Sequence, residues 1–173
     1  SLSSSNIEQR VDEVLEILDL KDQARAFIEE LSAGDRQKVA VGRAVIRRSE
    51  VLLFDEPTTN VEVQAKLQLI RAFKEVSRQF KQTTVYVTHD QTEAMTLADR
   101  IALMKDGHIV QYDSPQEIYQ NPSTEFGGWF IGNPGMNFIP AKIQSGFLQA
   151  TILGDSVRVE GDLGNKRVMI GVR

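Results

Sequence analysis

Residues 31–62 read LSAGDRQKVAVGRAVIRRSEVLLFDEPTTNVE, and they predict in succession a helix, an apolar strand that ends in two carboxylates and a loop. The stretch begins with a turn of small residues that opens the predicted helix. Ser32 can cap this helix, and Asp35 stands at its third position, where a carboxylate favours the positive helix end. Apolar residues then recur at helical spacing, and Arg47 and Arg48 suit the negative end of the last turn. We therefore predict a capped amphipathic helix with both arginines in its last turn.

An unbroken apolar run, Val51–Phe54, follows this helix. Such a run is typical of a strand that is buried on both faces of a parallel sheet. Asp55 and Glu56 come directly after it, at the carboxyl end of the strand, where open α/β sheets place their ligands. An acidic turn after a strand is common, so this pair alone does not distinguish an active site from a surface turn.

A second apolar strand, Thr84–Val87, ends in Thr88-His89-Asp90. A strand–helix–strand unit favours a parallel pair of strands. A lone histidine at a strand end is usually a surface residue, as we expect for His108, but His89 also precedes a predicted helix. Between the two strands, six apolar residues at helical spacing predict one long helix (Val63, Leu67, Ile70, Phe73, Val76 and Phe80).

The residues before Leu31 predict a helical segment. Ser5-Asn6-Ile7-Glu8 matches a capping box, and apolar residues at helical spacing extend the predicted helix to about Leu20. Lys21–Glu30 is ambiguous and suggests a turn with a short helix. The pattern is equally compatible with an ordinary packed helix and with one whose exposed face meets another protein.

The residues after Asp90 predict short elements. We expect a helix over about Gln91–Ala98, then a hairpin whose Lys105-Asp106-Gly107 turn tolerates positive φ. Ser114-Pro115-Gln116-Glu117 opens another short helix, and a further helix carries Phe126, Trp129 and Phe130. Gly132-Asn133-Pro134-Gly135 marks the clearest boundary. Beyond it the chain turns to β-type runs, at about Phe138–Ile143, Phe147–Leu153, Ser156–Val159 and Val168–Val172.

Length and composition restrict the classes of protein. The 173 residues suffice for one domain with part of a second, and no apolar run is long enough to span a membrane. A net charge of −4 without a basic block argues against nucleic-acid binding. The absence of cysteine excludes a disulfide scaffold and agrees with a cytoplasmic setting.

The motifs together resemble the ATP-binding cassette (ABC) ATPases. Leu31–Asp35 is similar to the signature loop of that family, Val51–Glu56 to its Walker B strand, Thr58–Glu62 to its D-loop and Thr88–Asp90 to its switch-histidine loop. The segment Phe130–Phe138 resembles the junction in carbohydrate-importer ABC ATPases, the group that contains the maltose-importer subunit, where the nucleotide-binding domain is followed by an OB-like regulatory domain.

This resemblance implies an α/β fold and a division of the chain. Residues 1–132 would be the C-terminal part of a P-loop NTPase domain with its helical subdomain, and 133–173 the start of a β-rich OB-like module. No G-x-x-x-x-G-K-[ST] phosphate loop occurs in the chain, so the resemblance covers only the second half of such a domain. We expect a truncated piece of a longer protein, inactive on its own.

The resemblance also implies roles for single residues. Glu56 would polarise the attacking water, His89 would contact the γ-phosphate, and Asp55 would support Mg²⁺, usually through water. The cofactors implied are therefore ATP and Mg²⁺. ATP bound to the opposite subunit would meet the signature loop and the D-loop, here represented by Ser32, Ala33, Gly34, Asp35, Asn60 and Glu62.

Three residues depart from the family pattern. Asp35 replaces the usual glutamine, and a carboxylate about 4 Å from a phosphate charge would repel it by ~1 kcal/mol in water or ~4 kcal/mol at an effective dielectric of 20. Its gain at the helix end is only ~0.3–1 kcal/mol. We therefore expect weaker ATP clamping unless Asp35 turns away or pairs with a cation such as Arg36. Glu62 replaces the D-loop aspartate, and Ala33 replaces a glycine.

The function implied is that of an ATP-binding subunit of an ABC importer for a carbohydrate, a polyol or a related solute. Its partners would be a second ATPase subunit and transmembrane permease subunits, with no nucleic acid and no direct insertion into the membrane. It would lie on the cytoplasmic face of the cell membrane. A soluble ABC ATPase of the DNA-repair or translation kind is an alternative, as is a non-catalytic regulatory protein if the natural chain has no phosphate loop.

Overall fold

A computed structural model of the chain describes residues 4–59, 61–150, 154, 157–159, 164–172. The chain forms two compact units, Ser1–Leu97 and Ala98–Arg173. The first contains α1 (Ser4–Ile17), two short 3-10 helices η1 (Lys21–Gln23) and η2 (Ile28–Glu30), α2 (Ala33–Val45), β1 (Val51–Asp55), α3 (Val63–Phe80), β2 (Thr83–Val87) and α4 (Gln91–Leu97).

The predicted parallel pair of strands is confirmed. β1 and β2 run parallel, with Val51 opposite Thr83 and Asp55 opposite Val87, and α3 connects them. The expectation that β1 is buried on both faces is wrong for this chain. Leu52 is 6% exposed whereas Leu53 is 75% exposed, because side chains alternate across a strand and only one face lies against the helices.

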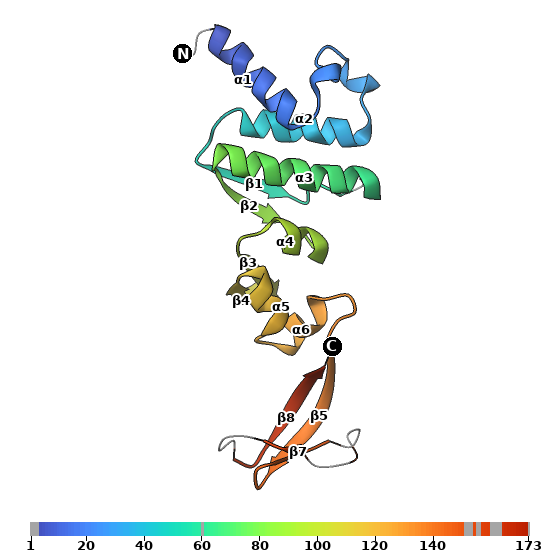
Figure 1. The fold of residues 1–173 in the computed structure, drawn as a ribbon, viewed down its shortest axis with the longest axis vertical. Coiled ribbons are helices and arrows are strands. Elements are labelled where there is room, and N and C mark those ends of the chain that lie inside the picture. Colours follow the sequence, from blue (N-terminus) through green and yellow to red (C-terminus); the bar gives the residue numbers. More distant parts are fainter. Residues whose placement is uncertain (1–3, 60, 151–153, 155–156, 160–163, 173) are drawn as a thin grey trace. The chain divides into compact units, whose positions relative to one another are not determined.

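The core of the first unit lies among α1, α2, α3 and the covered face of β1. Figure 1 shows α3 between α2 and the strand pair. Two glycines permit close helix packing: a Cβ on Gly42 would lie 3.0 Å from Leu18 Cδ1, and one on Gly34 would lie 3.0 Å from Ala65 Cβ. The buried core residues are Val14, Leu18, Leu20, Val41, Val45, Leu52, Leu69, Ala72, Phe73 and Val76.

Two predicted helix ends are corrected. α1 already includes Ser4, so Ser5 is not its N-cap, and it ends at Ile17 because Asp19 adopts a positive φ of 54°. α2 ends at Val45, and Arg47 and Arg48 lie beyond it, Arg48 with a positive φ of 52°. A residue in the left-handed conformation ends a helix. At both positions this effect outweighs the helical preference of the neighbouring residues.

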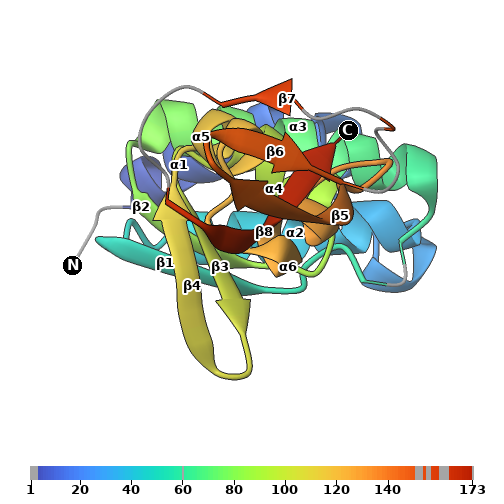
Figure 2. The same cartoon turned by 90° about the horizontal axis from the view of Figure 1, so that it is seen from below.

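The second unit begins with the predicted hairpin. β3 (Ile101–Lys105) and β4 (His108–Asp113) are antiparallel, and Figure 2 shows them as a two-stranded ribbon. Asp106 and Gly107 both have positive φ, 49° and 78°, as a tight hairpin turn requires. Two short helices follow, α5 (Pro115–Gln120) and α6 (Glu125–Phe130), each with a side-chain cap.

An antiparallel sheet completes the second unit. Its order is β7 (Val157–Arg158), β6 (Phe147–Gln149), β5 (Asn137–Gln144), β8 (Lys166–Val172), so the predicted β-rich segment is observed, apart from the parts of its runs that lie outside the described residues. The backbone N–H of Met136 donates to Gly128 O, so the segment around the predicted boundary packs back on α6. Division at residue 132 stays a prediction, as does an OB-like fold. In the described part of the chain, no helix is both long and apolar enough to cross a membrane.

Candidate active site

The predicted acidic pair lies at the carboxyl end of β1. Asp55 is the last residue of the strand, and Glu56 follows with a positive φ of 47°. The backbone N–H of Glu56 donates to Val87 O at the end of β2, at 2.9 Å. Since β1 and β2 are parallel, their carboxyl ends meet at one edge, and this edge carries both predicted loops.

His89 and Glu56 are in direct contact. Their atoms Nδ1 and Oε1 are 2.7 Å apart, and the Thr59 hydroxyl donates to the other Glu56 oxygen at 2.9 Å. The hydrogen bond to Glu56 raises the pKa of His89 above its ordinary value of 6.5. The same bond, with that from Thr59, lowers the pKa of Glu56 below 4.5. The pair therefore favours an imidazolium next to a carboxylate.

Asp55 offers an accessible carboxylate beside this pair. It is exposed, and within the described residues no cation or hydrogen-bond donor contacts its side chain. The described part of the chain also contains no cluster of three or more histidine, aspartate or glutamate ligands. One free carboxylate suits Mg²⁺, which usually takes one or two protein carboxylates and completes its shell with water and phosphate oxygens.

The predicted signature turn forms the start of α2. Ser32 is the N-cap, and its Oγ accepts from the Asp35 backbone N–H at 3.0 Å while donating to Asp35 Oδ2 at 2.6 Å. Lys38 Nζ lies 3.6 Å from Asp35 Oδ1. The cation that pairs with Asp35 is therefore Lys38, whereas Arg36 donates to Leu31 O. The contacts with Ser32 and Lys38 hold the Asp35 carboxylate and reduce the repulsion that we expect between it and a phosphate group.

The other signature residues take ordinary helical positions. Ala33 begins α2 without a positive φ, so the residue fits where the family has glycine. Gly34 is buried against Ala65 of α3. The Gln37 side chain donates to Pro57 O, which connects the signature helix to the loop after Glu56. This contact was not predicted from the sequence.

The predicted D-loop is only partly described. Asn60 lies outside the described residues. Glu62 is exposed and precedes α3 as its N-cap, but its side chain makes no capping hydrogen bond. Thr58 is buried, and its hydroxyl donates to Glu93 Oε1. The structure thus brings Asp55, Glu56 and His89 to one edge, with the signature turn at the start of another helix.

A buried carboxylate that sequence reasoning missed lies under the two loops. Glu93 on α4 is 0% exposed and accepts from Thr58, Tyr86, Thr88 and Lys66. Burial alone would raise its pKa, but the bond from Lys66 and three hydroxyl bonds lower it below 4.5. The sequence Asp90-Gln91-Thr92-Glu93 matches a capping box, which would have placed Glu93 at the helix start but not in the interior.

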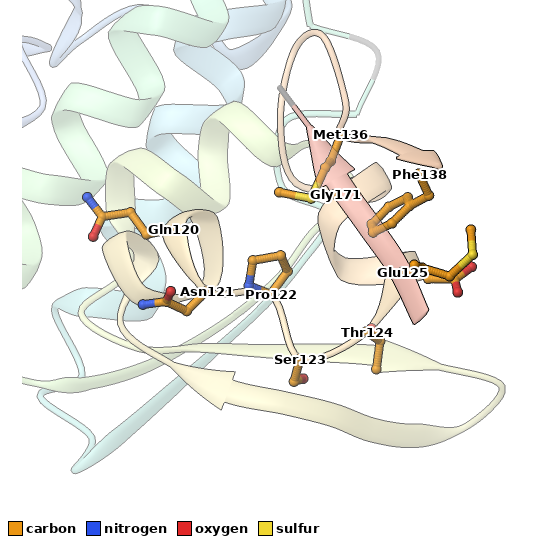
Figure 3. A pocket seen from close by; sticks show the side chains of 10 residues that line it. Gln120, Asn121, Pro122, Ser123, Thr124, Glu125, Met136, Phe138 and Gly171 are labelled. Atoms are coloured by element: carbon orange, nitrogen blue, oxygen red, sulfur yellow. The ribbon is translucent and has the colours of Figure 1, made fainter. Parts of the chain in front are cut away.

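The pocket in Figure 3 belongs to the second unit. It is an open hollow between the loop that joins α5 to α6 and the start of β5, and Met136 and Phe138 point toward it. None of the predicted site residues lines it. The chemistry suggested by the motifs therefore belongs to the exposed edge of β1 and β2.

Comparison with known proteins connects this geometry to a family. Residues 2–59 match the family model described as ABC transporter. The trehalose/maltose import ATP-binding protein of Thermococcus litoralis is 42% identical over 175 residues, which cover 96% of this chain and 47% of that protein. The diacetylchitobiose uptake system ATP-binding protein of Streptomyces coelicolor is 38% identical, with 99% of this chain and 47% of the relative covered.

A third relative is also an import ATP-binding protein, with similar identity and coverage. The sn-glycerol-3-phosphate import ATP-binding protein of Ruegeria sp. is 38% identical, with 99% of this chain and 48% of the relative covered. The chain thus spans about half the length of the curated relatives it matches. On these matches, the chain belongs to the ABC transporter ATP-binding proteins.

Proposed function

We propose that this chain is the second half of the nucleotide-binding domain, with the start of a regulatory OB-like domain, in an ATP-hydrolysing importer subunit. The substrate class proposed is a carbohydrate, a polyol or a related solute. The names of the relatives support it, since they refer to import of trehalose and maltose, diacetylchitobiose and glycerol 3-phosphate.

The observation that carries the proposal is the contact between Glu56 and His89. Two side chains 33 residues apart meet at 2.7 Å on the edge where parallel strands end, next to the accessible Asp55. A carboxylate whose pKa is lowered is a weak proton acceptor, so Glu56 would orient and polarise a water molecule more than it would remove the proton. The His89 ring would keep Glu56 in place and offer positive charge to a phosphate oxygen.

Asp55 would hold Mg²⁺, which supplies positive charge to the phosphate oxygens when it is bound. Ser32 to Asp35 would serve the ATP of a second subunit, because the backbone N–H groups at the start of α2 form an anion-binding end of a 13-residue helix. Asn60 and Glu62 would contribute across the same subunit interface. The partners are therefore a paired ATPase subunit and transmembrane permease subunits, at the cytoplasmic face of the membrane.

The test is Glu56→Gln in the full-length protein. The amide keeps the shape of the side chain but removes its charge, so we expect turnover to fall about 100-fold or more while ATP affinity changes little. Glu50→Gln, at the exposed amino end of β1, is the matched control and should keep normal turnover. Near-normal hydrolysis by Glu56→Gln would show that Glu56 does not assist the reaction.

The 173-residue chain by itself should not hydrolyse ATP, because it has no glycine-rich lysine loop to hold the phosphates. The measurement is phosphate release by the purified chain, with its Glu56→Gln variant as the control. Turnover that disappears in the variant would contradict this expectation.

A further inference from the structure

Glu93 is a buried carboxylate to which the proposed chemistry gives no role. Its side chain is 0% exposed, on a helix of only seven residues. Its partners among the described residues are all donors: the hydroxyls of Thr88 at 2.8 Å, Tyr86 at 2.9 Å and Thr58, and Lys66 Nζ at 2.8 Å. A buried carboxylate needs such donors, and four of them restrict its position strongly.

Two of these donors belong to the loops that carry the proposed catalytic pair. Thr58 follows Glu56 by two residues, and Thr88 immediately precedes His89. One oxygen of Glu93 accepts from Thr58 and the other from Thr88. A single carboxylate therefore connects the loop after β1 with the loop after β2.

The catalytic pair itself has little packing to hold it. The side chain of His89 is 77% exposed and that of Glu56 is 36% exposed. The contact between them therefore depends on the positions of the two loops. The positions of the two loops depend on buried hydrogen bonds, and Glu93 accepts one such bond from each loop.

We propose that Glu93 is a positioning residue that sets the two loops so that His89 meets Glu56. The proposal rests on the function proposed above for that pair. Glu93 does not contact the reacting groups: it acts through Thr58 and Thr88. Lys66 completes the arrangement, because its Nζ also lies 2.6 Å from Asp90, which caps α4 by accepting from the N–H groups of Thr92 and Glu93.

The first measurement is kinetic and uses Glu93→Gln in the full-length protein. The amide keeps the size of the side chain, but it places an NH₂ group against a donor and removes the charge that faces Lys66. We expect kcat for ATP hydrolysis to fall at least tenfold while the Kd for ATP stays within twofold. Glu75→Gln is the matched control, because the hydrogen-bond partners of Glu75 among the described residues, Arg78 and Gln79, lie on α3 itself.

The second measurement is spectroscopic and needs no ATPase activity. The chain contains two histidines, so ring resonances of His89 can be followed by NMR with His108 as the internal reference. Glu56→Gln defines the resonances of a His89 that has lost its carboxylate. In Glu93→Gln, we expect the His89 resonances to move more than half of the way to those values, with His108 unchanged.

Thr58→Val separates positioning from the charge of Glu93. It replaces the Thr58 hydroxyl with a methyl group of similar size and leaves the charge of Glu93 in place. A shift of the His89 resonances in the same direction as in Glu93→Gln therefore supports positioning. Unchanged His89 resonances in both Glu93→Gln and Thr58→Val would overturn the proposal, even if thermal unfolding or turnover changed, since Glu93 would then be structural only. If the unaltered full-length protein does not hydrolyse ATP, the proposed function fails, while the resonances still decide whether Glu93 positions His89.

Discussion

At the scale of single residues, the contact between Glu56 and His89 makes the site sensitive to pH. The pKa of His89 is raised and that of Glu56 is lowered, mainly by their mutual hydrogen bond. Both groups are charged between the lowered value and the raised one. Above the raised pKa the ring loses its proton and the attraction weakens, and below the lowered pKa the carboxylate gains one with the same result.

The first prediction concerns the titration of His89. Because a folded-state pKa above 6.5 requires the partner carboxylate, Glu56→Gln should return the His89 pKa toward that ordinary value. NMR titration of the ring resonances would measure it, with Thr59→Val as a control that removes only the second bond to Glu56. A pKa of His89 that is the same with and without Glu56 would show that the two side chains do not meet in solution.

At the scale of secondary-structure elements, α2 depends on close approach to its neighbours. A Cβ at Gly42 would lie 3.0 Å from Leu18 and 3.1 Å from Val14, both on or just after α1. Glycine in a helix interior ordinarily destabilises it, by ~0.8–1.0 kcal/mol relative to alanine. Glycine is favoured here because packing a methyl group into a filled core costs more than the helix gains.

The second prediction is therefore that Gly42→Ala lowers the free energy of unfolding. Overpacking costs ~1–3 kcal/mol, which offsets the propensity gain of about 1 kcal/mol and leaves a net loss of up to about 2 kcal/mol. Urea denaturation followed by circular dichroism would measure it. Ala40→Gly, at an exposed position of the same helix, gives the propensity effect alone. A gain in stability for Gly42→Ala would mean that α1 and α2 lie farther apart than in the structure.

The contact of Lys66 with Glu93 joins α3 to α4. Burial alone would lower the pKa of Lys66, but its hydrogen bonds to Asp90 and Glu93 raise it. Glu93 is 0% exposed, so removal of the cation would leave a buried charge with only hydroxyl donors. The structure therefore makes this lysine more important for stability than an ordinary surface lysine.

The third prediction is that Lys66→Met destabilises the chain by about 3 kcal/mol, the cost of leaving a buried charge without its partner. Lys74→Met is the matched control, because Lys74 lies exposed on the same helix and should give a change near zero. The midpoints of urea denaturation would compare them. Equal midpoints for the two variants would show that the hydroxyl donors alone suffice for Glu93.

At the scale of the whole molecule, the signature turn and the catalytic pair lie on different elements of one chain. The turn at the start of α2 offers backbone N–H groups to an anion. In the proposed dimer, this turn serves the ATP of the other subunit. Bulk added at Ser32, which is exposed, should then affect association and leave the subunit's own ATP site unchanged.

The fourth prediction is that Ser32→Arg in the full-length, hydrolysis-deficient protein prevents ATP-dependent dimerisation. ATP binding to the single subunit should remain, because the altered residue lies outside that subunit's own pocket. Analytical ultracentrifugation with and without ATP would measure association, and Ser77→Arg, at an exposed position of α3, controls for added charge and bulk. Normal dimerisation of Ser32→Arg would contradict a role for the turn across the interface.

The elements that the sequence determined are those specified by local chemistry. The bounds of α3 follow from apolar residues at helical spacing, and the hairpin turn follows from Asp106-Gly107, because each depends on residues close in the chain. The meeting of Glu56 with His89 was also predictable in outline, since the carboxyl ends of parallel strands share one edge of the sheet. Such signals lie within a few residues and need no knowledge of distant contacts.

Which side chains are enclosed, and by which neighbours, depends on how distant segments of the chain pack together. The exposure of Leu53 depends on which elements cover β1, and the burial of Glu93 depends on a hydroxyl from the distant loop after β1 and on a lysine of α3. The ends of α1 and α2 were also decided by the way the chain turns back on itself, through positive φ values at Asp19 and Arg48. The physical reason is that burial and hydrogen bonding of a side chain are set by neighbours in space, which periodicity along the chain does not specify.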